Sequence, residues 1–209
     1  MTMKDYRSSI SGILRWPTPA SRAWVDQLLA SAPANKNVLA IVAVGSSVRV
    51  DVASEDLDLV VVCLDRSTFK AKAPIEVDMK AFELVSIEAD LSKGHPLLCW
   101  SVKFGVAIFD RNDTWEGVWK SWHTRVPLPD PSQTGKRGRK LLPTLATIRE
   151  MGDTGAENEL EVSFTTFLAR AALSERGVFP ASRPELPQQL RLVGQYQLAE
   201  ELLATLRKR

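Results

Sequence analysis

The sequence predicts an α+β protein, in which a small mixed β-sheet flanked by helices is followed by a helical C-terminal part. Strand-like segments, either apolar runs or alternating apolar and polar residues, lie between residues 38 and 109. A stretch rich in proline and glycine, typical of a linker, follows at residues 125–140. Beyond it, apolar residues recur at helical spacing. We therefore expect two domains, residues 1–128 and residues 129–209.

Four segments have the patterns of β-strands. Val38–Val44 is a continuous apolar run, which is typical of a strand buried on both faces. Residues 57–64 form a second run, rich in β-branched side chains, and residues 75–84 alternate as a half-buried strand does. The fourth segment, residues 105–109, is short and is closed by Asp110-Arg111-Asn112-Asp113. These four segments account for the expected sheet.

Helical spacing of apolar residues predicts helices on both sides of the linker. The first part has two, at residues 18–31 and 114–124, and Asp113 is a candidate N-cap of the second. The C-terminal part has one at residues 156–176, ended by a glycine, and one at residues 195–208.

Four basic residues lie close together in the expected linker, namely Lys136, Arg137, Arg139 and Lys140. Such a cluster can contact phosphate or nucleic acid. Because no aromatic residues are interleaved with it, we favour a solvated linker.

Length and composition restrict the class of protein. The chain has 209 residues, 44% of them hydrophobic, and a formal net charge of +2, so no strong overall field attracts it to nucleic acid or membrane. No secretory signal is recognisable at the N-terminus, and the apolar runs are too short to cross a bilayer. Cys63 and Cys99 match no disulfide framework. These features predict a cytoplasmic protein with reduced cysteines.

The segment that carries chemistry begins where the first strand ends, at Gly45-Ser46-Ser47. Glycine has no Cβ, so the backbone there can approach a ligand closely. Ser46 or Ser47 can cap a short helix, whose free N–H groups favour a phosphate. A Gly-Ser pair alone is an ordinary turn signal, and Ser47 can equally be a plain N-cap.

Two aspartates open the second expected strand, two positions apart. The side chains of Asp56 and Asp58 therefore point to the same face. Two neighbouring carboxylates repel, and a divalent cation is the natural compensation. Mg²⁺ is usually held by one or two carboxylates, with water and substrate phosphates completing its coordination. We expect Asp56 and Asp58 to be magnesium ligands.

A third carboxylate, Asp78, lies on the alternating segment, on the same face as Glu76 and Lys80. If this strand pairs beside that of Asp58, Asp78 can ligate the metal or accept the proton of an acceptor hydroxyl. The alternative for Asp78 is a solvated position on a half-exposed strand, and Glu76 is the competing carboxylate.

The order of these residues resembles the DNA polymerase β-like nucleotidyltransferase superfamily, in particular its small bacterial branches, the minimal nucleotidyltransferases and the aminoglycoside adenylyltransferases. The resemblance covers residues 38–109, with Gly45-Ser46, Asp56-Leu57-Asp58-Leu59 and Asp78 as its motifs. It implies that Gly45 and Ser46 hold the triphosphate of a nucleotide, with ATP the expected one. It also implies that Asp56, Asp58 and Asp78 are the catalytic, Mg²⁺-binding residues.

A weaker part of the resemblance lies at residues 102–110, which look like the family's strand after the third carboxylate. There Lys103 is a candidate phosphate contact, although a solvated strand-end charge is the favoured interpretation. Two departures stand beside it: Arg49 is followed by Val50 where small members often have glycine, and Glu55 precedes Asp56 where they often have serine. Neither departure removes a metal ligand.

The resemblance implies an enzyme that transfers a nucleoside monophosphate from a nucleoside triphosphate to an unidentified hydroxyl acceptor and releases pyrophosphate. The alternative is a non-catalytic or toxin–antitoxin-like module with a nucleotidyltransferase fold, against which the presence of all three carboxylates argues. A transferase acting on RNA is a third hypothesis, and it predicts a larger basic face than a net charge of +2 suggests.

Overall fold

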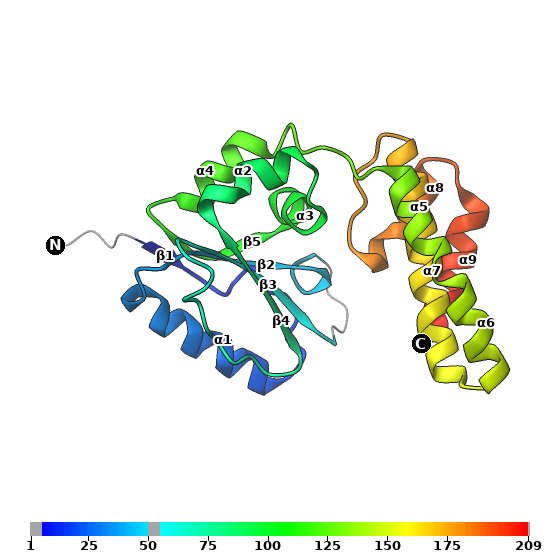
Figure 1. Cartoon of the computed structure of the whole chain (residues 1–209), viewed down its shortest axis with the longest axis horizontal. Helices are drawn as coiled ribbons and strands as arrows, with labels where there is room; N and C mark the ends of the chain where they lie inside the picture. Colours follow the sequence, from blue (N-terminus) through cyan, green and yellow to red (C-terminus); the bar gives the residue numbers. More distant parts are fainter. Residues whose placement is uncertain (1–5, 50–54, 209) are drawn as a thin grey trace. The chain divides into compact units, whose positions relative to one another are not determined.

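The computed structural model describes residues 6–49 and 55–208. The chain divides into two compact units, Met1–Pro127 and Leu128–Arg209. The N-terminal unit contains a mixed β-sheet with helices, and the C-terminal unit is built from helices (Figure 1). The α+β fold class is therefore confirmed.

The sheet has five strands in the order β1-β5-β2-β3-β4. The pairing of β3 with β4 is parallel and the other three pairings are antiparallel, so the sheet is mixed. All four predicted strands are present, and β1 is an additional edge strand of three residues, too short to show a pattern in the sequence. The strands are β1 (Tyr6–Ser8), β2 (Val38–Val44), β3 (Leu57–Cys63), β4 (Val77–Glu83) and β5 (Val106–Arg111).

Helices cover both faces of the sheet, α1 on one face and α2, α3 and α4 on the other (Figure 1). Helix α1 begins after a capping box, in which Thr18 and Ser21 exchange hydrogen bonds. Helices α2 and α3 were not predicted from the sequence. Residues 102–104, which were expected to lead into a strand, form the last turn of α3. The bounds are α1 (Pro19–Ser31), α2 (Leu84–Ser92), α3 (Pro96–Phe104) and α4 (Thr114–Trp122).

Alternation along β3 decides which side chains enter the core. Leu57, Leu59 and Val61 are buried in one cluster with Val25 and Leu29 of α1. Because successive side chains of a strand point to opposite faces, Asp58 points to the face away from α1. The core on the α1 side thus fixes the orientation of the carboxylate at the start of this strand.

Asp113 occupies the predicted N-cap position of α4, but its side chain does not cap the helix. Asp113 has a left-handed backbone conformation (φ 54°), and its side chain makes no capping hydrogen bond. The buried carboxylate of Asp110 caps α4 instead, accepting hydrogen bonds from the backbone N–H groups of Trp115 (2.9 Å) and Glu116 (3.1 Å). Asp113 pairs with Arg7 on the surface at 2.8 Å. The tight turn after β5 thus places the carboxylate of Asp110 at the N-terminus of α4, where backbone N–H groups lack helical partners.

The linker expected at residues 125–140 is wrong for most of its length, because α5 (Pro131–Arg139) occupies it. The helix begins with Asp130, whose side chain accepts a hydrogen bond from the N–H of Gln133 at 3.1 Å. Gly138 lies against α7, since a Cβ at this position would be 2.9 Å from the Cβ of Phe167. The glycine therefore permits close helix packing, whereas the sequence pattern suggested a flexible linker.

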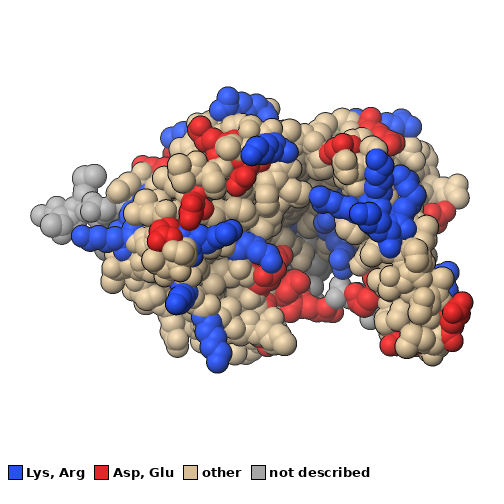
Figure 2. Space-filling view, in the orientation of Figure 1, with Lys and Arg blue, Asp and Glu red and all other residues tan. Residues whose placement is uncertain are grey.

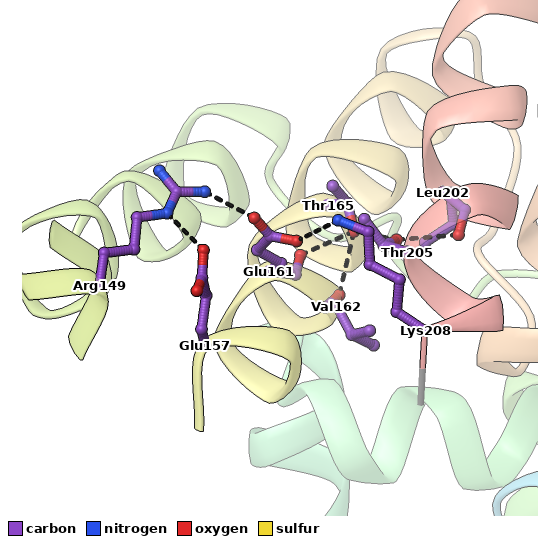
Figure 3. Close-up of polar contacts among 8 residues, drawn as sticks. All are labelled: Arg149, Glu157, Glu161, Val162, Thr165, Leu202, Thr205 and Lys208. Carbon is purple, nitrogen blue, oxygen red and sulfur yellow. Dashed lines mark hydrogen bonds and ion pairs between the residues drawn. The ribbon is translucent and has the colours of Figure 1, made fainter. Parts of the chain in front are cut away.

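Four further helices complete the C-terminal unit, and α7, α8 and α9 share a buried apolar cluster that includes Leu173, Leu190 and Leu202. An ionic network joins α6, α7 and α9 (Figure 3): Arg149 contacts Glu157 at 2.7 Å and Glu161 at 2.5 Å, and Lys208 contacts Glu161 at 2.9 Å. The bounds are α6 (Leu142–Met151), α7 (Thr154–Glu175), α8 (Leu186–Leu192) and α9 (Tyr196–Arg207).

Both cysteines are buried free thiols, and burial raises the pKa of Cys99 to about 11. Within residues 6–49 and 55–208, none of the helices combines the length and the apolar character that crossing a membrane would require.

Candidate functional site

Three strands bring the predicted site residues to one edge of the sheet. Val44, the last residue of β2, is opposite Asp58 in the antiparallel pairing with β3. Asp58 is in turn beside Asp78 in the parallel pairing of β3 with β4. Gly45, Asp58 and Asp78, which are distant in the sequence, are therefore neighbours in the fold. The pairing on which a role of Asp78 depended, that of its strand with the strand of Asp58, is therefore present.

Gly45 is required by its backbone conformation and by its surroundings. Its φ of 86° and ψ of −165° lie in a region that is essentially restricted to glycine. A Cβ at this position would be 2.7 Å from Oδ2 of Asp58. The close approach that the sequence analysis expected at Gly45 is thus an approach to the carboxylate of Asp58.

Asp58 is in an environment that disfavours its charged form. Its pKa is raised from 3.8 to about 6, first by burial, then by the negative charge of Asp56 and then by that of Asp78. Lys80 acts in the opposite direction and lowers the pKa. Asp56 and Asp78 are themselves exposed. The three predicted carboxylates are therefore close enough to interact electrostatically. Burial adds to this effect at Asp58 and makes its ionisation unfavourable.

Lys80 is a member of this cluster to which the sequence analysis assigned no role. Its Nζ lies 3.6 Å from Oδ2 of Asp78, and both side chains are exposed. The signal was present in the sequence, since residues two apart on a strand share a face. The positive charge of Lys80 thus partly compensates Asp58 and Asp78.

The donor chemistry of the cluster fits Mg²⁺, which prefers carboxylate and phosphate oxygens. In the part of the chain that the structure describes, however, no three His, Cys, Asp or Glu side chains are arranged as a metal-binding group. Two carboxylates can suffice for Mg²⁺ when substrate phosphates complete its coordination. Asp56 and Asp58 would then hold the ion, and Asp78 remains engaged with Lys80.

Ser46 or Ser47 was expected to cap a short helix, but neither serine is at the N-cap position. They lie inside η2 (Ser46–Val48), a single 3₁₀ turn whose N-cap residue is Gly45, which has no side chain to cap it. The buried hydroxyl of Ser47 donates to the carbonyl of Val44 at 3.3 Å, and the carbonyl of Ser47 accepts from the N–H of Leu14 at 2.8 Å. Ser47 thus secures the turn from within. Ser46 is partly exposed at the same turn.

Lys103 is not joined to the carboxylates. It lies in the last turn of α3, where its Nζ donates to the carbonyl of His123 at 3.3 Å. The charge of Lys103 also does not contribute to the raised pKa of Asp58. The expected strand-end position is wrong because α3 continues to Phe104, whose ring packs under the guanidinium of Arg49 at 4.6 Å. For Arg49 the sequence favours a surface pair with Asp51 or Glu55 over a phosphate contact, and of these two partners Asp51 lies outside the described residues.

A hollow of about 630 Å³ beside β4 does not include the carboxylates. Its strand residues are Met79 and Ala81, which alternate with Asp78 and Lys80 and therefore point to the opposite face. The remaining lining comes from the loop before β4: Arg66, Phe69, Lys70, Ala71 and Lys72. The candidate site is thus separate from this hollow.

Comparisons with known proteins show a distant structural similarity. No protein-family model matches the sequence. No curated protein sequence matches it either. Among solved structures, the chain is similar to the crystal structure of a nucleotidyltransferase-like protein from Exiguobacterium sibiricum 255-15, with 18% identity over 90% of this chain and 71% of that chain, and a TM-score of 0.40.

Proposed function

We propose that the chain is a Mg²⁺-dependent nucleotidyltransferase, which moves a nucleoside monophosphate from a nucleoside triphosphate to a hydroxyl acceptor. The observation that carries the proposal is the contact of the Gly45 turn with the carboxylate of Asp58, in a cluster with Asp56 and Asp78. A chain gains nothing in stability from three neighbouring carboxylates, one of them partly buried. Their presence at a glycine turn is accounted for by a ligand of opposite charge.

Each residue has a chemical role in this proposal. Asp56 and Asp58 would hold Mg²⁺, which neutralises phosphate charge and acts as a Lewis acid at the α-phosphate. The turn at Gly45 and Ser46 would face the β- and γ-phosphates with backbone N–H groups. Asp78 would accept the proton of the acceptor hydroxyl, and its contact with Lys80 would hold the side chain in place.

The proposed reaction is an in-line displacement at the α-phosphorus. The acceptor oxygen forms a bond to that phosphorus while the bond to the oxygen that bridges to the β-phosphorus breaks. Pyrophosphate leaves, and the hydroxyl proton passes to the Asp78 carboxylate. No oxidant, reductant or further reactant is needed.

The test is Mg²⁺-dependent binding of ATP, GTP, CTP and UTP, measured by isothermal titration calorimetry, which requires no acceptor. We expect binding in the native chain and its loss in the double variant Asp56→Asn with Asp58→Asn. The matched control replaces two exposed carboxylates elsewhere in the unit, Asp26→Asn with Glu88→Gln, and should bind as the native chain does. Binding that needs no Mg²⁺, or that survives in the double variant, would refute the proposal.

Asp78 is tested separately, by turnover with an acceptor once one is found. Asp78→Asn should retain Mg²⁺-dependent nucleotide binding but lower the rate by about 10²–10⁴-fold, which is the usual contribution of a general base. A rate within a few fold of the native rate would remove Asp78 from the catalytic group.

One observation favours the non-catalytic alternative, namely that the described carboxylates do not form a set of three metal ligands. A module that only keeps the fold would show no Mg²⁺-dependent binding of any of the four nucleotides. The same calorimetric measurement therefore distinguishes the two functions.

A further inference from the structure

Helix α5 is polar over its whole length, which is unusual for a helix that packs in a unit. After Pro131 its sequence is SQTGKRGR, without one apolar side chain. It nevertheless packs against α7, because Gly135 and Gly138 are buried and the second lies against Phe167. A helix without an apolar stripe contributes little to the hydrophobic core. What the helix supplies is a rigid support for its outer face.

The outer face of α5 is strongly basic. Lys136, Arg137, Arg139 and Lys140, which we call the α5 basic face, are all exposed. Lys and Arg side chains gather over α5 in Figure 2. Within the residues that the structure describes, none of the four side chains has an ion-pair or hydrogen-bond partner. The α5 basic face is therefore an uncompensated concentration of charge.

Three other cations of the same unit are compensated. Arg149 and Lys208 contact glutamates of α7 (Figure 3), and Arg191 contacts Glu200 at 2.7 Å. Arg176 and Arg207 are exposed cations without an ion pair among the described residues, but the α5 basic face differs from them in gathering four cations within five consecutive positions.

The charge on α5 is unfavourable for the isolated helix. Lys136 lies three and four residues before Arg139 and Lys140, so these like charges are neighbours on the helix surface. Each such pair destabilises a helix by about 0.2–0.5 kcal/mol. The helix dipole favours cations in the last turn, but its effect is of similar size and does not require four of them. A ligand of opposite charge would remove the repulsion.

We propose that the α5 basic face binds the phosphodiester backbone of nucleic acid. Phosphate contacts need only cations on a fixed support and can be independent of base sequence. The exposed face of α5 offers no apolar anchor of the kind that dominates protein–protein interfaces or inserts into membranes. The absence of interleaved aromatic residues argues against base stacking but not against backbone contacts.

This inference extends beyond the proposed nucleotidyl transfer and does not depend on it. Binding is therefore measured without nucleotide or Mg²⁺, by fluorescence anisotropy of a labelled 20-nucleotide single strand in RNA and DNA forms. Neutralising about four phosphates of a single strand gives a slope of log affinity against log salt near −3. Affinity should then fall about 50-fold between 50 and 200 mM salt.

The test variant replaces all four residues of the α5 basic face with glutamine, which keeps helix propensity. The matched control makes four Gln substitutions at exposed cations elsewhere, at Lys36, Lys93, Arg176 and Arg207, and so changes the net charge equally. Circular dichroism verifies that both variants keep their helix content. We expect the α5 variant to lose at least 10-fold in affinity at 50 mM salt and most of the slope, and the control to lose less than 3-fold.

RNA and DNA arms separate the sources of the backbone: equal binding indicates phosphate alone, and stronger binding of RNA indicates a role of the 2′-hydroxyl. Either result supports the proposal if the α5 variant abolishes it. The proposal is overturned if neither strand binds at 50 mM salt, or if the α5 variant and the control lose affinity equally. It is also overturned if only anionic phosphatidylserine vesicles or a polyglutamate peptide binds.

Discussion

Replacing Asp58 with asparagine should stabilise the protein while removing the proposed function. The folded state raises the pKa of Asp58 from 3.8 to about 6, so the ionised carboxylate is less stable in the folded chain than in the unfolded one. A shift of about two units corresponds to about 3 kcal/mol. Because the new amide must also be accommodated beside the Gly45 turn, we expect a gain of about 1–3 kcal/mol at pH 7.5.

The sign of the pH dependence follows from the raised pKa. Between about pH 4 and pH 6 the folded state binds more protons at Asp58 than the unfolded state does, so the native protein loses stability as the pH rises through this window. Asparagine does not titrate. The advantage of Asp58→Asn should therefore be largest above pH 6 and should disappear near pH 4.

The assay is thermal unfolding by circular dichroism at pH 4.0, 5.5 and 7.5, in the presence of a metal chelator. For a chain of this size, each kcal/mol raises Tm by about 3 °C, so the expected gain at pH 7.5 is about 3–9 °C. Asp78→Asn is the control, since its side chain is exposed and should change Tm little. A lower Tm for Asp58→Asn at pH 7.5, or a gain that is equal at all three pH values, would refute this account of the site.

Two glycine pairs test the packing arguments by chemical denaturation. Gly45→Ala should cost about 1–3 kcal/mol of stability, because of the backbone conformation of Gly45 and its contact with Asp58. Gly177 also has a positive φ, but a Cβ there would have nothing within 4 Å, so Gly177→Ala should cost about 1 kcal/mol. Equal losses for the two variants would show that the contact with Asp58 does not affect stability. Gly138→Ala should destabilise the chain by about 1–3 kcal/mol through collision with α7, whereas Gly117→Ala, in open space on α4, should stabilise it by about 0.5–1 kcal/mol. A stabilising Gly138→Ala would show that α5 does not need its close approach.

The strands that position the site were predictable because their signal is local. Val38–Val44 is apolar throughout, and each of its residues is buried in the sheet centre. The alternation around Asp58 likewise determines its face without knowledge of the partner strands. The convergence of Gly45, Asp58 and Asp78 was predictable only in part, since it required the parallel pairing of β3 with β4.

Other features depend on contacts between distant segments, which no local pattern records. Asp113 is of a residue type that often caps helices, but the turn after β5 places the side chain of Asp110, not that of Asp113, in hydrogen-bonding contact with the N-terminus of α4. The salt bridge of Lys80 and the inward hydrogen bond of Ser47 likewise depend on how neighbouring strands and turns meet.

Amino-acid order alone thus determined four of the five strands of the sheet and the acidic character of one sheet edge, because burial and alternation act within a single segment. Tertiary structure decided whether glycine means a flexible chain or a close contact, as the helix in place of the expected linker shows. It also decided which charges are compensated. The physical reason is that a packing distance, or the effect of one charge on another, depends on two segments that meet in the fold. The sequence of one segment alone does not show which other segment it meets.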